Sequence, residues 1–439
     1  AESDLYDWRA VSVTTVRLRD ARQAGDAARL MAVLQPCLKP NVFNVCDWRI
    51  YCASRTTTKA CIEELVDEVC AALSWLSARR GLSDTLTAEW RAFLSAGRAS
   101  LGNPALLLSG GAMLSIYHFG VIKALLELEM LPTVISGSSG GACVAAFACC
   151  FTDAELREVL RRATDEPEAS ELWREFGSHG PFHGRCFWKM CQLLRQGHIY
   201  EWEDFMRHMR WFSKGLTFRE AFERTGRVLN VTCTPIRSHG GGCSPPLMLN
   251  HIDTPHVDIA SAVCASACVP GLIKPAHLME KGPDGTLRPY HAHQSGESIE
   301  SRVLLRDGSF ESDVPIHQVA SHFGMSFAIV AQVNPHIVPF YAHLLGRPGR
   351  PSGGRAHTGE WRGGFLFSAL EVFFKEGMRA IMRTFQQLRL DWKFFGLDLT
   401  HVWLQPLDPH VAGVTLTPDL CLADCRDLIA NLPNPSELR

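Results

Sequence analysis

Residues 131–147 read LPTVISGSSGGACVAAF, and this stretch decides the fold of the chain. Its first part, from Thr133 to Ser136, has the β-branched density of a short buried strand. The strand runs into Gly137-Ser138-Ser139-Gly140-Gly141, which fits the pattern G-x-S-x-G with Ser139 at its centre. Glycines on both sides let the backbone turn sharply into a helix and push the central hydroxyl outward. We therefore expect a strand, a tight turn and a helix, with Ser139 as the candidate nucleophile.

The same stretch has two other interpretations. Clusters of serine and glycine are common in ordinary loops, but the strand before and the small-residue helix after favour a catalytic turn. No residue from Met130 to Thr152 is charged, and about 20 apolar residues suffice to cross a membrane. Several glycines and serines in the middle of this segment argue against a membrane span.

A second glycine turn precedes the first. The apolar strand Ala105–Leu108 ends at Ser109-Gly110-Gly111, and a helix with a regular buried side follows. This succession predicts a parallel βαβ unit whose two turns lie side by side at the carboxyl ends of neighbouring strands. The amides of Gly110, Gly111 and Gly140 could then stabilise an oxyanion formed over Ser139. A dinucleotide-binding loop is disfavoured, because G-x-G-x-x-G is not matched and no acidic residue is suitably placed after the second strand.

A carboxylate is the candidate partner of this serine. Residues 303–305 read as a strand, and Asp307-Gly308-Ser309 interrupts it. An Asp-Gly pair at a strand end is usually only a turn, but strand ends in such a sheet converge on one rim, where Asp307 could deprotonate Ser139. A Ser-His-Asp triad stays open at this point, since four histidines follow Asp307: His317, His322, His336 and His401.

Composition restricts the class of protein. The 439 residues allow two or three domains, and a formal net charge of −2 gives nucleic-acid binding no electrostatic support. No C-x-x-C pair occurs among the sixteen cysteines, and five of them stand in apolar runs: Cys143, Cys149, Cys150, Cys264 and Cys268. We therefore expect buried free thiols in a reducing compartment rather than disulfides or zinc ligands. The chain opens without methionine and shows no signal peptide. Any targeting segment before residue 1 would not be visible in this sequence.

Four segments are expected along the chain. A helical N-terminal module covers residues 1–98, and a catalytic domain covers 99–345, with an aromatic-rich helical cap inserted at about 152–215 whose side chains could equally pack in the core. A loop rich in Gly, Arg and Pro spans 346–364. Residues 365–439 hold an amphipathic basic helix, Leu366–Phe395, and a tail. Such a helix can lie on an anionic lipid surface, although docking on the core is the commoner use of the pattern.

Four motifs in this order resemble the patatin-like phospholipase family, whose enzymes use a Ser-Asp dyad without histidine. They are Ser109-Gly110-Gly111-Ala112, Gly137–Gly141, Ala265-Ser266-Ala267-Cys268-Val269-Pro270 and Asp307-Gly308-Ser309. The chain is most similar to the triacylglycerol lipases of eukaryotic lipid droplets within that family, which carry a helical module before the catalytic domain. Further phrases of these lipases are matched at Tyr117–Val121, Arg227–Thr232 and Gln332–His336.

The resemblance implies a three-layer α/β/α fold with a mainly parallel sheet, after a helical N-terminal module. It implies that Ser139 is the nucleophile and Asp307 the base, with oxyanion amides at Gly110, Gly111, Ala112 and Gly140. The activity implied is triacylglycerol hydrolysis through an acyl-enzyme, with no metal and no cofactor, at the surface of an intracellular lipid droplet or endomembrane. The partner is then the lipid substrate, nucleic acid is excluded, and protein partners stay unspecified.

The chain also departs from the family's pattern. The glycine turn carries Ala112 and Ser115 in place of glycines, and an alanine amide serves as well only if its φ stays negative. Ser309 replaces a Gly or Ala, and no H-x-x-x-x-D acyltransferase pattern occurs. Three alternatives follow: a phospholipase A or lysophospholipase on the same dyad, a catalytically impaired lipid-surface scaffold, and a nucleotide-binding oxidoreductase, which lacks its fingerprint.

Overall fold

The structure is a computed structural model of the whole chain. It describes residues 3–47, 50, 59–78, 84–175, 198, 202–235, 247–268, 273, 277–290, 305–308, 313–334 and 413–418, with single residues and pairs between 373 and 398. These residues divide into two compact units, one within Ala1–Asn103 and the other beginning at Pro104. Several predicted features lie outside the described residues: Val269, Pro270, Ser309, His336, His401 and the loop 346–364.

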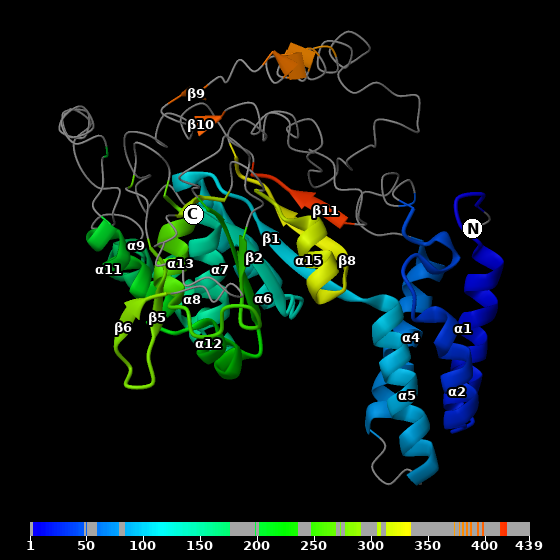
Figure 1. The fold of residues 1–439 in the computed structure, drawn as a ribbon. Coiled ribbons are helices and arrows are strands. Elements are labelled where there is room, and N and C mark those ends of the chain that lie inside the picture. The colour runs from blue at the N-terminus through cyan, green and yellow to red at the C-terminus, as the bar shows by residue number, and fades with distance from the viewer. Residues whose placement is uncertain are drawn as a thin grey trace, which may run out of the picture. The chain divides into compact units, whose positions relative to one another are not determined.

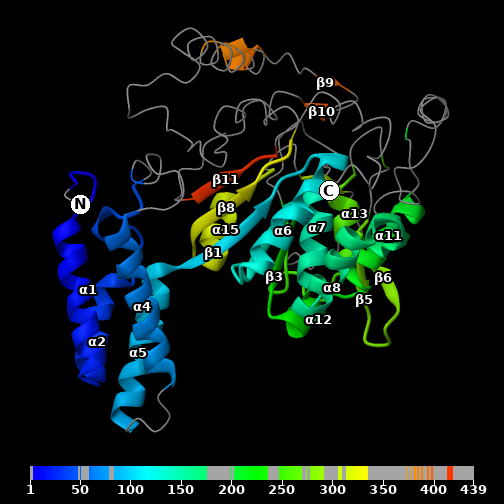
Figure 2. The same ribbon diagram turned by 180° about the vertical axis from the view of Figure 1, so that it is seen from behind.

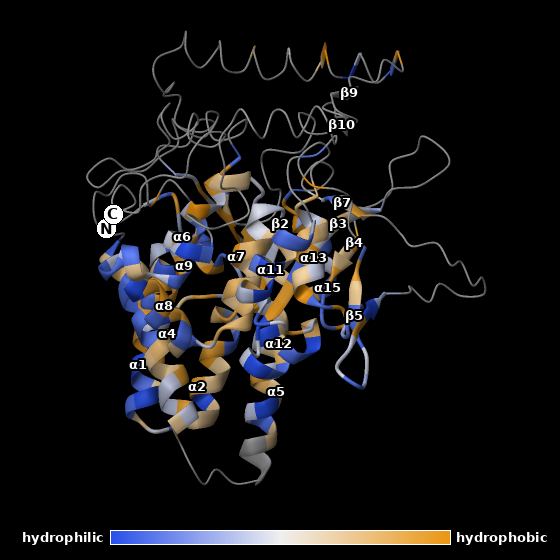
Figure 3. Cartoon of the chain, turned by 90° about the vertical axis from the view of Figure 1, so that its left-hand side faces the viewer, coloured by the Kyte–Doolittle hydropathy of each residue, from blue (hydrophilic) through white to orange (hydrophobic). Residues whose placement is uncertain are grey.

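The N-terminal unit is helical, as expected. Its helices are α1 (Trp8–Gln23), α2 (Ala27–Leu34), α4 (Ala60–Ala78) and α5 (Asp84–Leu101). Hydrophobic and hydrophilic residues alternate along them (Figure 3), and a core that includes Leu18, Leu30 and Leu65 lies between them. The buried Glu68 accepts hydrogen bonds from Arg22 at 2.6 and 3.2 Å, which joins α4 to α1. Ile62, Leu65 and Leu76 of α4 are buried in this core, whereas Val66 is 52% exposed.

A mainly parallel sheet forms the second unit (Figure 1). Its strands are ordered β11-β8-β1-β2-β3-β4, and β7 also pairs with β3. β1 (Asn103–Leu108) runs parallel to β2 (Val134–Ser138), and β2 runs parallel to β3 (Val228–Pro235). β8 (Met325–Ala331) and β11 (Gly413–Leu416) form a further parallel pair. β4 (Leu247–Leu249) and β7 (Leu305–Asp307) run antiparallel to β3. The predicted parallel βαβ unit is therefore correct.

Helices cover both faces of this sheet. Side chains alternate along β1, so Leu106 and Leu108 enter one core and Ala105 and Leu107 another. The first core is covered by α6 (Tyr117–Glu127), α7 (Gly140–Cys150), α12 (Phe218–Thr225) and α13 (Ile259–Ser266), which stand in front of the sheet in Figure 2. On the second face Val319 of α15 (Ile316–Phe323) packs against the sheet. The fold is the expected three-layer α/β/α arrangement.

The segment predicted as a cap is part of the helical layer where it is described. α8 (Asp153–Asp165) and α11 (Trp202–Ser213) contribute buried side chains to the core of the first face. Phe212 is 1% exposed, and its ring lies 6.4 Å from that of Phe147 on α7. For these two helices the alternative of core packing holds, since Leu156 and Leu160 of α8 and Phe205 and Phe212 of α11 are buried.

The predicted helix over 366–395 is wrong at its end. Lys393–Phe394 forms β9, which pairs antiparallel with β10, Leu397–Asp398. Most of this segment lies outside the described residues, but Phe373 and Ile381 are in helical backbone and are 78% and 50% exposed. These two apolar side chains are therefore not buried against the core.

Two sequence-level expectations concern the buried apolar runs. Among the described residues, no helix is long and apolar enough to span a membrane, and α7 has only 11 residues. The five cysteines in apolar runs are buried free thiols, as predicted: Cys143, Cys149, Cys150, Cys264 and Cys268. Burial raises the pKa of Cys150 and Cys264 well above the ordinary thiol value, so these groups stay protonated.

Candidate active site

Ser139 stands at the turn between β2 and α7. Its φ of 51° and ψ of −124° form the strained conformation expected of a nucleophile between a strand and a helix, and the residue is 7% exposed. The flanking glycines are required by space. A Cβ on Gly137 would overlap the carbonyl of Gly141, and one on Gly141 would lie 2.5 Å from the carbonyl oxygens of Leu108 and Ser109. The G-x-S-x-G pattern therefore has a steric cause.

The second glycine turn lies directly beside Ser139. A Cβ on Gly140 would lie 2.6 Å from Ser115 Oγ and 2.7 Å from the carbonyl oxygen of Ala112, so the two turns are in contact as predicted. Ala112 itself has a φ of +49°. The condition that its φ stays negative is thus not met, and a left-handed alanine costs about 1–2 kcal/mol.

Gly110 differs from the prediction. Its N–H donates a hydrogen bond of 2.6 Å to Oδ1 of Asp313, so in this structure it is not available to an oxyanion. The next two amides of the turn belong to Gly111 and Ala112, whose φ values are 149° and 49°. Together with Gly140 at the first turn of α7, they are the remaining candidate donors on this side of Ser139.

Asp307 and Ser139 are held by one short segment at the end of α13. The amide of Ser139 donates to Ser266 Oγ at 2.8 Å, and Ser266 Oγ donates to the Thr232 carbonyl at 2.7 Å. The amide of Asp307 donates to the carbonyl of Cys268, two residues further on, at 3.1 Å.

The sheet register agrees with this placement. Ser138 pairs with Thr232 on β3, and the next β3 residue, Cys233, pairs with Asp307 on β7. Asp307 is 1% exposed. Because Cys233 pairs with Leu247 of β4 on its other edge, β7 lies on the same edge of β3 as β2, and Asp307 stands directly beyond the end of β2.

Sequence reasoning missed Asp313. It is 3% exposed, and besides Gly110 its carboxylate accepts Asn334 Nδ2 at 2.6 Å and Gln332 Nε2 at 3.4 Å. Burial raises its pKa to about 7, with a further contribution from the nearby Asp307. The available signal was the match at Gln332–His336, which placed two amide side chains just after a strand without indicating what they bind.

His118 lies beneath the glycine turn. Its Nε2 is 2.9 Å from the carbonyl oxygen of Ser109, which can only accept, so Nε2 carries a proton and donates it. Its Nδ1 has no hydrogen-bond partner among the described residues. The side chain is fully buried, and burial lowers its pKa to about 4. It therefore supports the turn after β1 in the uncharged state.

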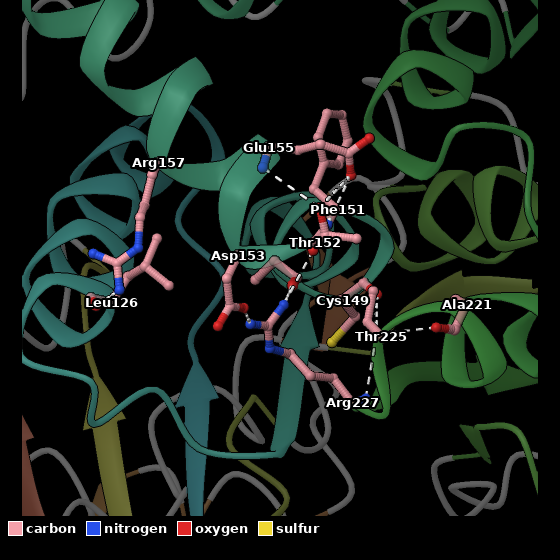
Figure 4. Close-up of polar contacts among 11 residues, drawn as sticks. Leu126, Cys149, Phe151, Thr152, Asp153, Glu155, Arg157, Ala221, Thr225 and Arg227 are labelled. Carbon is pink, nitrogen blue, oxygen red and sulfur yellow. Dashed lines mark hydrogen bonds and ion pairs between the residues drawn. The ribbon is translucent and has the colours of Figure 1, made fainter.

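The far end of α7 is anchored by Arg227. This side chain donates to the carbonyls of Ala148 and Phe151 at 2.8 and 3.1 Å and pairs with Asp153 (Figure 4). A cation at this end complements the helix dipole, whose positive end lies at Ser139. The site thus combines a strained hydroxyl, a buried carboxylate and amide donors at a helix N-terminus, which are the groups that acyl transfer uses.

Comparison with known proteins identifies the family. The sequence profile of the family described as "Patatin-like phospholipase" matches residues 106–320, and that of DUF3336, a domain of unknown function, matches residues 1–96. Among solved structures, VipD from Legionella pneumophila matches 72% of this chain and 61% of its own, with a TM-score of 0.31 and 13% identity. This likeness is too low to carry an argument, so the family assignment rests on sequence.

Relatives named as patatin-like phospholipase domain-containing proteins match nearly the whole chain. One from Aspergillus niger is 36% identical over 96% of this chain and 52% of its own length. One from Coccidioides immitis is 37% identical over 95% of this chain and 54% of its own length. One from Cryptococcus neoformans is 35% identical over 100% of this chain and 47% of its own length. The chain thus spans about half the length of these relatives. It belongs to the patatin-like phospholipase family.

Proposed function

We propose that this chain is a serine lipid acyl hydrolase that works through an acyl-enzyme on Ser139 with Asp307 as the base. One observation carries the proposal: residues 266–268 at the end of α13 bind the amides of both Ser139 and Asp307, at 2.8 and 3.1 Å. The residues that carry the nucleophile and the carboxylate are then positioned by the same three-residue segment, which supports a Ser-Asp dyad.

The reaction takes two steps. Ser139 Oγ attacks the ester carbonyl carbon while its proton passes to the Asp307 carboxylate, and the amides of Gly111, Ala112 and Gly140 bind the resulting oxyanion. The ester C–O bond breaks, and the leaving alcohol takes the proton from Asp307. Water then loses a proton to Asp307 as it attacks the acyl carbon. The fatty acid leaves, and Ser139 Oγ recovers a proton.

The proposed substrate is triacylglycerol, met at a droplet or membrane surface. Support comes from the resemblance at Tyr117–Val121, Arg227–Thr232 and Gln332–His336 and from the helical unit before the catalytic domain. The exposed Phe373 and Ile381, with the exposed Arg383 in the same segment, suit contact with a lipid surface. Phospholipid is the second candidate, because the related fungal proteins are named as phospholipase domain-containing.

The test compares emulsified triacylglycerol with phosphatidylcholine vesicles. We expect Ser139→Ala to abolish hydrolysis, and Asp307→Asn to lower turnover by about 10²–10⁴ because the base is lost. Matched controls are Asp165→Asn, an exposed carboxylate on α8, and His317→Ala, an exposed histidine on α15, both of which should keep most activity.

Each outcome has a separate meaning. Hydrolysis of triacylglycerol that is lost with Ser139 supports the proposal, and turnover of phosphatidylcholine alone keeps the dyad but changes the substrate. Loss of activity in a histidine variant only would replace the dyad with a triad. If neither lipid is hydrolysed and a fluorophosphonate ester does not label Ser139, the impaired scaffold is the better description.

A further inference from the structure

Asp313 connects the ends of three adjacent strands. Its Oδ1 accepts the amide of Gly110 after β1 at 2.6 Å, and its Oδ2 accepts Asn334 Nδ2 after β8 at 2.6 Å. Its backbone carbonyl accepts the hydroxyl of Ser138, the residue before the nucleophile, at 2.6 Å. Strands β8, β1 and β2 are neighbours in the sheet. One buried residue therefore bonds to both the glycine turn and the nucleophile turn.

The bond to Gly110 acts on the two amides that follow it. Gly111 and Ala112 have φ values of 149° and 49°, and the second is a left-handed conformation that an alanine adopts only where its surroundings enforce it. Ser109 adds to this restraint, since its hydroxyl donates to the Gly110 carbonyl and accepts the amide of Val333, both at 2.9 Å. A fixed Gly110 therefore fixes the direction in which the next two N–H groups point.

We propose that Asp313 is a positioning residue that holds the oxyanion turn in register with Ser139. The proposal rests on the acyl-transfer function proposed above, because it assigns Gly111 and Ala112 as the donors and Gly110 as their anchor. Asp313 acts through Gly110 and Ser138 and does not touch the reacting atoms. Loss of its carboxylate should affect the transition state, where the oxyanion exists, more than substrate binding.

The kinetic test uses three variants. Asp313→Ala should lower kcat by about 10²–10³, the effect of losing one oxyanion donor, with KM within about threefold of wild type. Asp313→Asn should restore kcat to within about tenfold, because its amide oxygen can still accept the Gly110 N–H. Asp258→Ala is the control: Asp258 is 2% exposed and caps the opposite end of α13 by accepting the amide of Ser261 at 3.1 Å.

Hydrogen exchange measures the tether independently of turnover. In Asp313→Ala, but not in Asp258→Ala, the peptide covering residues 108–114 should exchange its amides faster, and Asp313→Asn should recover protection. Unchanged exchange in Asp313→Ala would overturn the proposal, as would a loss of kcat that Asp258→Ala reproduces or a change confined to KM. If wild type and Ser139→Ala are equally inactive, the proposed function fails, and exchange at residues 108–114 still decides whether Asp313 holds the turn.

Discussion

Replacing His118 by glutamine should remove a defined part of the acid sensitivity of this fold. His118 has a pKa of about 4 in the folded chain, against about 6.5 when exposed, because burial disfavours the imidazolium. The unfolded chain therefore binds more protons between these values, and stability is lost as the pH falls from 6.5 towards 4. At about pH 4.5 the loss from this group is about 2.5 kcal/mol, since each pKa unit is worth about 1.4 kcal/mol.

Urea unfolding at about pH 7 and about pH 4.5 measures this difference. His118→Gln keeps an amide donor within reach of the Ser109 carbonyl and carries no titrating group, so its loss of unfolding free energy between the two pH values should be smaller by about 2.5 kcal/mol. His317→Gln, an exposed histidine on α15, should lose as much as wild type. An equal loss in His118→Gln and wild type would refute the reasoning, because the imidazole would then ionise without cost in the folded chain.

Two further substitutions test the backbone around the nucleophile. Ala112→Gly removes the left-handed penalty of about 1–2 kcal/mol from the folded state, which stabilises the variant. It also raises the entropy of the unfolded chain, which destabilises the variant by about 0.4–1 kcal/mol. We therefore expect a thermal midpoint equal to or above that of wild type, with ester hydrolysis retained. Hydrolysis that appears only in this variant would instead indicate an impaired wild type. Arg227→Met removes the guanidinium donor from the carbonyls of Ala148 and Phe151, and we expect it to lower the free energy of unfolding by about 2 kcal/mol. Thermal unfolding measures this loss, and kcat should be unchanged below the transition. An unchanged midpoint would show that the end of α7 needs no cation.

The nucleophile turn was predictable because its signal is local. Gly137 and Gly141 are required by carbonyl oxygens within a few ångströms, and the strand and helix that flank them have their own apolar patterns. The contact between the two turns was predictable too, since a parallel βαβ unit places the ends of neighbouring strands together. These features follow from steric and topological rules that act over about 30 residues.

Asp313 could not be predicted by the same means. In sequence it stands before a valine and a proline, where an aspartate usually belongs to a turn. Its partners Gly110 and Ser138 are 203 and 175 residues away, so nothing local indicates that they meet. The positive φ of Ala112 was missed for a related reason: glycine signals such a conformation in the sequence, whereas an alanine held there by its surroundings does not.

Two buried carboxylates near Ser139 raise the question of which one is the base. Asp313 accepts Gly110 through one oxygen and Asn334 and Gln332 through the other, so accepting a proton from Ser139 would displace one of these donors. Asp307 instead ends β7 in the register row next to the nucleophile turn, and its amide is bound by the segment that also binds Ser139. We therefore assign the proton transfer to Asp307 and the positioning to Asp313. Asparagine separates the two roles, because its amide oxygen can replace an acceptor of hydrogen bonds but cannot take up a proton near neutral pH.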